Sequence, residues 1–129
     1  MDENGKICSF QELAKKDSKE KKSLKAVVFD IIWNDDVDLT SKPILERKKI
    51  LDSVLSEKSS IITAIEYKEL DVNNPEFPKQ ASELFEQAKK INCEGIMIKV
   101  ADSKLSTYDT AGSRKQWIKV LLSNNASIA

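Results

Sequence analysis

The sequence of 129 residues contains no histidine and only two cysteines. The lack of histidine excludes histidine bases and serine–histidine catalytic triads. Cys8 and Cys93 do not have the spacing of metal ligands, so a zinc site is excluded as well, and we expect two idle or buried thiols in a reducing compartment. No apolar run approaches the ~20 residues that a membrane span requires. The charged N-terminus also lacks the apolar segment of a signal peptide, so we expect an intracellular protein with no membrane segment.

The sequence also has no net charge, because 21 basic residues balance 21 acidic ones. The field of the whole chain therefore does not favour nucleic acid as that of a strongly basic domain would, and any contact with DNA must be local. A local basic excess lies in residues 14–25, a polar run that we interpret as a loop or a short exposed helix. Its lysines are Lys15, Lys16, Lys19, Lys21, Lys22 and Lys25.

The order of the apolar segments predicts one mixed α+β domain, since the length suits a single core. Runs of β-branched and aromatic residues predict strands at 26–33, 61–67, 95–100 and 116–122. Apolar residues at helical spacing predict a helix that begins near Pro43, with Thr40 or Ser41 as its cap. The same spacing predicts a second amphipathic helix marked by Ala81, Leu84, Phe85, Ala88 and Ile91.

Four charged residues lie inside or at the edge of the predicted strands, namely Asp30, Glu94, Lys99 and Lys119. A buried charge without a partner is costly, so each of them needs a partner or must reach water at a strand end, and spacing alone favours the second reading. In an ideal strand Glu94 and Lys99 point to opposite faces. They can therefore meet one ligand only if Glu94 lies in the turn before the strand.

Five segments resemble, in order, the later motifs of ATP-dependent DNA ligases, most closely those of the eukaryotic replicative type. The resemblance runs nearly from end to end, and the order and separations of the segments make it specific. The segments are NGKICSFQEL at 4–13, VFDIIW at 28–33, PILER at 43–47, EGIMIK at 94–99 and the approach to a "W-x-K-x-K" motif at 108–119. The resemblance implies a partial ATP-grasp-like nucleotidyltransferase fold of mainly antiparallel strands with flanking helices. It assigns residues 1–122 to part of the adenylation domain and leaves 123–129 as a polar tail.

The resemblance also implies a nucleotide site. Phe29 would stack on the adenine of ATP, which is worth about 0.5–1.5 kcal/mol beyond the burial of area. Glu94 would hold Mg²⁺, a hard cation that prefers carboxylate oxygens and water. Lys99 and Lys119 would line the phosphates, where their ammonium groups stabilise charge on the α-phosphate. The structural alternative for Phe29 is an ordinary core aromatic.

For Arg47, in the helix segment, pairing on the helix surface with Glu46 or Asp52 is the preferred reading. Two basic positions of the family pattern are also missing, because Leu121 stands at the second lysine of the last motif and Ser113 where an arginine is expected, with Arg114 one place late. These departures affect the handling of the triphosphate.

The family's nucleophile is a lysine in a "K-x-D-G" element upstream of the adenine-stacking aromatic, and this sequence has glycine only at positions 5, 95 and 112. The partial match at 15–18 lacks that glycine and lies too close to Phe29. By the same resemblance, we expect this chain to lack the acidic residue that contacts ribose in the family and the OB-fold domain that follows. We therefore expect no catalytic residue in this chain and no activity of the chain alone, and we favour an excerpt of a ligase over a two-chain enzyme or a decayed paralogue.

The parent enzyme is expected to seal nicked double-stranded DNA with ATP and Mg²⁺, through lysyl-AMP and DNA-adenylate intermediates, in replication, repair and recombination in the nucleus. An RNA ligase or an mRNA capping enzyme is an alternative within the superfamily. A binding module without catalysis, whose lysines at 15–25 contact phosphates or an acidic partner, is an alternative from another class. If the strands that would cover the 26–33 and 95–100 segments are absent, exposed apolar faces predict poor solubility or dimerisation.

Overall fold

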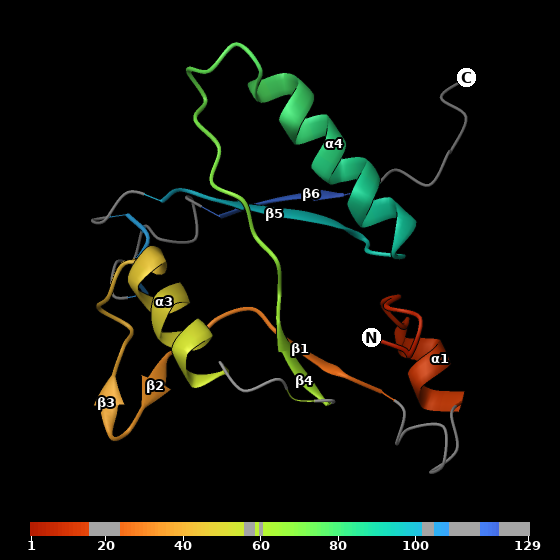
Figure 1. Cartoon of the computed structure of the whole chain (residues 1–129), viewed down its shortest axis with the longest axis horizontal. Coiled ribbons are helices and arrows are strands. Elements are labelled where there is room, and N and C mark those ends of the chain that lie inside the picture. The colour runs from red at the N-terminus through yellow and green to blue at the C-terminus, as the bar shows by residue number, and fades with distance from the viewer. Residues whose placement is uncertain (16–23, 56–58, 60, 102–104, 109–116, 122–129) are drawn as a thin grey trace.

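The computed structural model describes residues 1–15, 24–55, 59, 61–101, 105–108 and 117–121. In chain order its elements are α1 (Phe10–Lys15), β1 (Ala26–Val28), β2 (Trp33–Asn34), β3 (Val37–Asp38), α3 (Ile44–Val54), β4 (Ile62–Ala64), α4 (Phe77–Lys90), β5 (Gly95–Lys99) and β6 (Trp117–Leu121) (Figure 1). The predicted mixture of helices and strands is confirmed. Most of the lysine-rich run at 14–25 lies outside the described residues, as does the predicted tail at 123–129.

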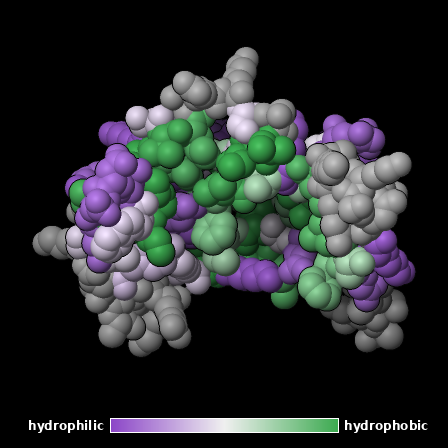
Figure 2. Space-filling model, turned by 90° about the horizontal axis from the view of Figure 1, so that it is seen from below, coloured by the Kyte–Doolittle hydropathy of each residue, from purple (hydrophilic) through white to green (hydrophobic). Residues whose placement is uncertain are grey.

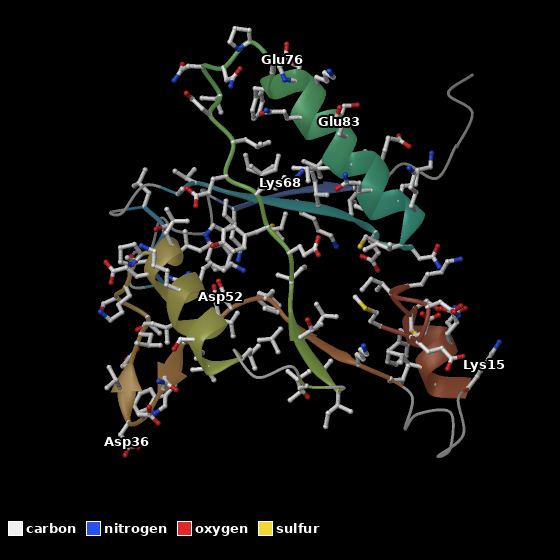
Figure 3. All side chains as sticks on the ribbon, in the orientation of Figure 1. Lys15, Asp36, Asp52, Lys68, Glu76 and Glu83 are labelled. Carbon is white, nitrogen blue, oxygen red and sulfur yellow. The ribbon has the colours of Figure 1, made fainter. Side chains whose placement is uncertain are left out.

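The described strands form three pairs. β1 pairs with β4 in parallel, with Ala26 opposite Ile62, while β2 with β3 and β5 with β6 are antiparallel. The β2–β3 hairpin turns at two residues with positive φ, Asp35 at 47° and Asp36 at 61°, as a tight hairpin turn requires. Figure 3 shows Asp36 at the tip of this hairpin. Two of the three described pairs thus have the predicted antiparallel direction.

The predicted strand at 26–33 is interrupted. The ladder with β4 runs from the Ala26 amide, which donates to the Ile61 carbonyl at 2.7 Å, to the Val28 carbonyl, which accepts from the Ile65 amide at 2.8 Å. Residues 29–32 leave the ladder, and the chain resumes pairing only in β2. The physical reason is the charge inside the run, because the carboxylate of Asp30 is bound by a side chain of α3 and not by the sheet.

α3 begins after Pro43, as predicted, but its predicted cap is wrong. No side-chain cap hydrogen bond is described at this end from the preceding residues, and Thr40 instead bonds the carboxylate of Asp38. The backbone amide of Ile44, at the start of the helix, donates to Oγ of Ser106 at 3.0 Å, across 62 positions of the sequence. The hydroxyl of a residue distant in sequence thus accepts the hydrogen bond that a local N-cap side chain would otherwise accept.

α1 begins with a reciprocal pair of hydrogen bonds. The amide of Glu12 donates to Oγ of Ser9 at 3.2 Å, and the amide of Ser9 donates to the Glu12 carboxylate at 2.7 Å. This capping box satisfies two amides at the start of the helix. The segment before it is tied to the end of α4, because the Ile7 amide donates to the Ile91 carbonyl at 2.8 Å.

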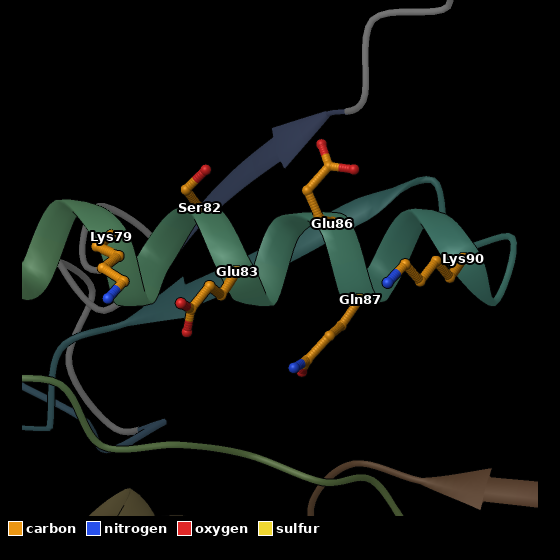
Figure 4. Close-up of a pocket in the computed structure, with 6 residues that line it drawn as sticks. All are labelled: Lys79, Ser82, Glu83, Glu86, Gln87 and Lys90. Carbon is orange, nitrogen blue, oxygen red and sulfur yellow. The ribbon is translucent and has the colours of Figure 1, made fainter.

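α4 lies along β5 and is amphipathic (Figure 1). The apolar residues that predicted it are half-buried from Ala81 to Ala88. Its opposite face is polar, and Figure 4 shows the side chains of that face around a shallow hollow. They are Lys79, Ser82, Glu83, Glu86, Gln87 and Lys90.

The described core is small. Its buried apolar side chains are Leu39, Ile44 and Leu51, and many other large apolar side chains are exposed. Figure 2 shows hydrophobic residues gathered over the middle of one face of the molecule. The exposed residues include Phe29, Ile32, Trp33, Ile62, Ile65, Met97, Ile98, Ile118 and Leu121. In the part of the chain that the structure describes, the apolar faces are therefore incompletely covered, as the sequence suggests, and the effect on solubility stays a prediction.

Candidate functional site

Two of the predicted site residues lie on one face of the β5–β6 pair. The register places Lys99 opposite Trp117 and Lys119 opposite Met97. Directly opposed residues of an antiparallel pair point to the same side, and residues two apart in a strand share a face. Lys99 and Lys119 therefore project from the same side of the sheet, together with Met97, which is exposed and which the sequence reasoning did not select.

Phe29 and Lys99 come together from different elements. Phe29 follows the last residue of β1, and 59% of it is exposed, so it is not the ordinary core aromatic that was the alternative reading. The Lys99 Nζ lies 5.4 Å from the centre of the Phe29 ring and 4.2 Å from that of Trp117. Such distances are within the range of cation–π attraction. An exposed aromatic face thus lies beside an ammonium group.

Lys99 is largely buried, and the carboxylate of Asp30 is its nearest described acidic partner, with Nζ 3.9 Å from Oδ2. Burial lowers the pKa of Lys99, and the charge of Asp30 opposes this effect. Lys99 is therefore not a strand-end charge that simply reaches water. Its ammonium group lies near the Asp30 carboxylate and within cation–π distance of the Phe29 and Trp117 rings.

Glu94 lies in the bend before β5 and not in the strand. This is the condition under which it and Lys99 could serve one ligand. Its carboxylate accepts a hydrogen bond from Lys119 Nζ at 3.1 Å, and both side chains are exposed, by 83% and 53%. Glu94 and Lys99 lie at opposite ends of β5, about 16 Å apart at ~3.3 Å per residue. A ligand that touches both must extend along the strand.

Gly95, next to Glu94, permits the close approach of β6. A Cβ built there would lie 2.0 Å from the carbonyl oxygen of Val120 and 2.9 Å from its carbon. Both atoms belong to the backbone and cannot turn away. Only glycine therefore allows the pairing that places Lys119 beside Glu94.

A buried polar cluster lies behind Phe29, and the sequence reasoning missed it. Asp30 accepts hydrogen bonds from Arg47 Nε at 2.9 Å, Arg47 Nη2 at 3.0 Å and the Tyr108 hydroxyl at 2.9 Å. Burial alone would raise the pKa of Asp30, but the hydrogen bonds from Arg47 and Tyr108 hold it below the usual value. Burial and the neighbouring carboxylate raise the pKa of Tyr108 to about 12, so the hydroxyl stays protonated and donates.

The predicted surface position of Arg47 is wrong. Its side chain is fully buried, and its partner is Asp30 and neither Glu46 nor Asp52, which are exposed residues of the same helix. Arg47 Nη1 also donates to the carbonyls of Lys42 and Ser106, and the guanidinium lies 4.6 Å from the Tyr108 ring centre. An acid inside an apolar run and an arginine on the apolar side of a helix were the available signals, since each needs a buried partner.

The hollow on α4 lies apart from these residues. The hollow on α4 is lined by one exposed helical face of mixed charge and includes none of the residues above (Figure 4). Among the described residues, no group of three or more histidine, cysteine, aspartate or glutamate side chains could hold a metal ion. Likewise, no described helix is long and apolar enough to cross a membrane.

Comparison with known proteins identifies the family of the chain. The family described as ATP dependent DNA ligase domain matches residues 1–120. The chain is 31% identical over 125 residues to a DNA ligase of Saccharolobus islandicus, covering 92% of this chain and 20% of that protein. It is 29% identical over 125 residues to DNA ligase 1 of Schizosaccharomyces pombe, covering 92% of this chain and 16% of that protein. The chain thus spans a fifth or less of these curated relatives, and it belongs to the ATP-dependent DNA ligase domain family.

Proposed function

We propose that this chain supplies part of the ATP site of a DNA ligase that seals nicks in double-stranded DNA through lysyl-AMP and DNA-adenylate intermediates. The observation that carries the proposal is the exposed ring of Phe29 beside Lys99, on a sheet face that also bears Lys119. A flat aromatic surface next to ammonium groups suits a ligand that combines a planar base with phosphates. The names of the relatives favour DNA ligation over the RNA ligase and capping alternatives.

Each predicted residue has a role in this proposal. Phe29 stacks on adenine, because its ring is accessible and the backbone behind it is fixed. Lys119 is exposed and can reach a phosphate directly. Lys99 is anchored at Asp30, so it contributes positive charge at the edge of the ring more than a mobile contact.

The residues fit Mg²⁺ only as a partial site. Glu94 is a single carboxylate, and Mg²⁺ is commonly bound by one or two carboxylates together with substrate phosphates and water. Glu94 already pairs with Lys119, so a metal there competes with this exposed pair, which is worth little in water. We propose that Glu94 would hold Mg²⁺ in place of Lys119, and that the ion would supply positive charge to the phosphates of a bound nucleotide.

The remaining predictions extend this proposal to the whole protein. We propose that residues 1–122 form part of an adenylation domain with an ATP-grasp-like nucleotidyltransferase fold, with 123–129 as its tail. The parent enzyme acts in replication, repair and recombination in the nucleus. The chain alone forms no lysyl-AMP, because its sequence has no "K-x-D-G" element.

The test is incubation with radiolabelled ATP and Mg²⁺. The chain is compared with a longer protein in which the coding sequence directly upstream is included. Covalent label that survives denaturation at alkaline pH is expected only on the longer protein, and Phe29→Ala should reduce its formation, whereas Ser82→Ala on the outer face of α4 should not. Label on the chain alone would contradict the proposed absence of a nucleophile, and equal labelling of the Phe29→Ala protein would contradict the adenine site.

A further inference from the structure

The backbone that carries the Phe29 ring lies just beyond the end of a strand ladder. The last ladder bond described there joins the Ile65 amide to the Val28 carbonyl at 2.8 Å. The next two residues are held by a helix instead. The ammonium group of Lys48 donates to the Phe29 carbonyl, and the guanidinium of Arg47 donates twice to the Asp30 carboxylate, at 2.9 and 3.0 Å.

Arg47 and Lys48 are adjacent on α3 and both are buried. Buried polar groups of the backbone need partners, and a carbonyl that leaves a sheet loses the one that the sheet provides. Lys48 supplies that partner at Phe29, and its Nζ also lies 5.1 Å from the Tyr67 ring centre. Two adjacent side chains of α3 thus donate hydrogen bonds to two adjacent residues, Phe29 and Asp30.

A buried lysine at position 48 contributes little to the free energy of folding. It is only 6% exposed, its described hydrogen-bond acceptor is a neutral carbonyl, and burial lowers its pKa. Buried charges often contribute less to stability than apolar residues of similar size, whereas they can specify one geometry. A long side chain that ends on the carbonyl of an exposed aromatic residue is suited to fix the direction in which the ring projects.

We propose that Lys48, supported by Arg47, is a positioning residue that sets the Phe29 ring for stacking on a nucleotide base. The proposal rests on the proposed function for its ligand but not for its geometry. It assigns α3 a task at the nucleotide site although none of its side chains needs to touch the nucleotide.

The test uses Lys48→Met, which keeps the length and the apolar stem of the side chain and removes its donor. Lys49→Met, at the exposed neighbouring position of α3, is the matched control. Arg47 is unsuitable as the first variant, because its loss leaves Asp30 buried and unpaired and the protein can fail to fold. The first readout is the ring carbon–proton NMR signals of Phe29, assigned by their loss in Phe29→Ala. Lys48→Met should shift or broaden them, and Lys49→Met should not.

The second readout is affinity for ATP, measured in a cycle with Phe29→Ala. Lys48→Met should weaken ATP binding about fivefold, the effect of one hydrogen bond, and should have less than a roughly twofold effect when Phe29 is already alanine. An equal loss in both backgrounds, or an unchanged ring signal, would overturn the positioning role. These affinities are measured on the longer protein of the labelling test. If its wild type binds no ATP, the proposed function fails, and the ring signals alone then decide the positioning role.

Discussion

Replacing Arg47 by methionine should destabilise the protein by about 3–5 kcal/mol, because this removes one partner of a buried ion pair and leaves the other charge uncompensated. The side chains of Arg47 and Asp30 are 0% and 4% exposed. The substitution removes two hydrogen bonds to the Asp30 carboxylate and two to backbone carbonyls. A domain of this size has a total stability of roughly 5–15 kcal/mol, so this change takes away a large part of it.

Urea unfolding followed by the fluorescence of Trp33 and Trp117 measures the loss. The double variant Arg47→Met with Asp30→Asn removes the stranded charge as well, and it should recover at least about 1–2 kcal/mol of the single variant's loss. A loss below about 1 kcal/mol for Arg47→Met would refute the buried pair. So would a double variant no more stable than Arg47→Met.

Three further predictions concern Asp30, Gly95 and Ser106. Because the pKa of Asp30 is lowered in the folded protein, its contribution to the free energy of unfolding is complete above the unfolded pKa of about 3.9. This contribution is lost as the pH falls through the folded pKa. Urea unfolding at a series of pH values should show the loss in the wild type and less of it in Asp30→Asn. Gly95→Ala should cost about 3 kcal/mol or more, because its Cβ meets a backbone carbonyl at 2.0 Å, and a melting temperature unchanged from that of the wild type would contradict the close approach. Ser106→Ala should cost about 1 kcal/mol by removing the acceptor of the Ile44 amide, whereas Ser41→Ala should cost less, and the reverse order in urea unfolding would restore the predicted local cap.

The sequence predicted best where a local pattern decides the structure. The start of α3 follows from Pro43 and its apolar stripe, and the extent of β5 follows from a short apolar run bounded by a charge at each end. These signals lie within a few residues of the structure that they predict.

The sequence predicted poorly where the partner is distant. Asp30 and Arg47 are 17 positions apart, and Ser106 caps a helix 62 positions away, so no periodicity connects them. The strand at 26–33 was overextended for the same reason, since only the tertiary position of Arg47 draws Asp30 out of the ladder. The β-propensity of residues 26–33 predicts a strand, and the buried charge of Asp30 determines where that strand ends.

The polar cluster behind Phe29 also joins parts of the chain that meet only after long loops have closed. Tyr108 bonds Asp30 across 78 positions, and Ser106 bonds Ile44 across 62. Contacts of such separation carry a large entropic cost before they give any stabilisation, and they slow folding. The cluster should therefore form late, and substitutions in it should raise the unfolding rate much more than they lower the folding rate, which the two limbs of a denaturant-dependent kinetic experiment would separate. In that case the cluster mainly slows unfolding, so its contribution is kinetic stability.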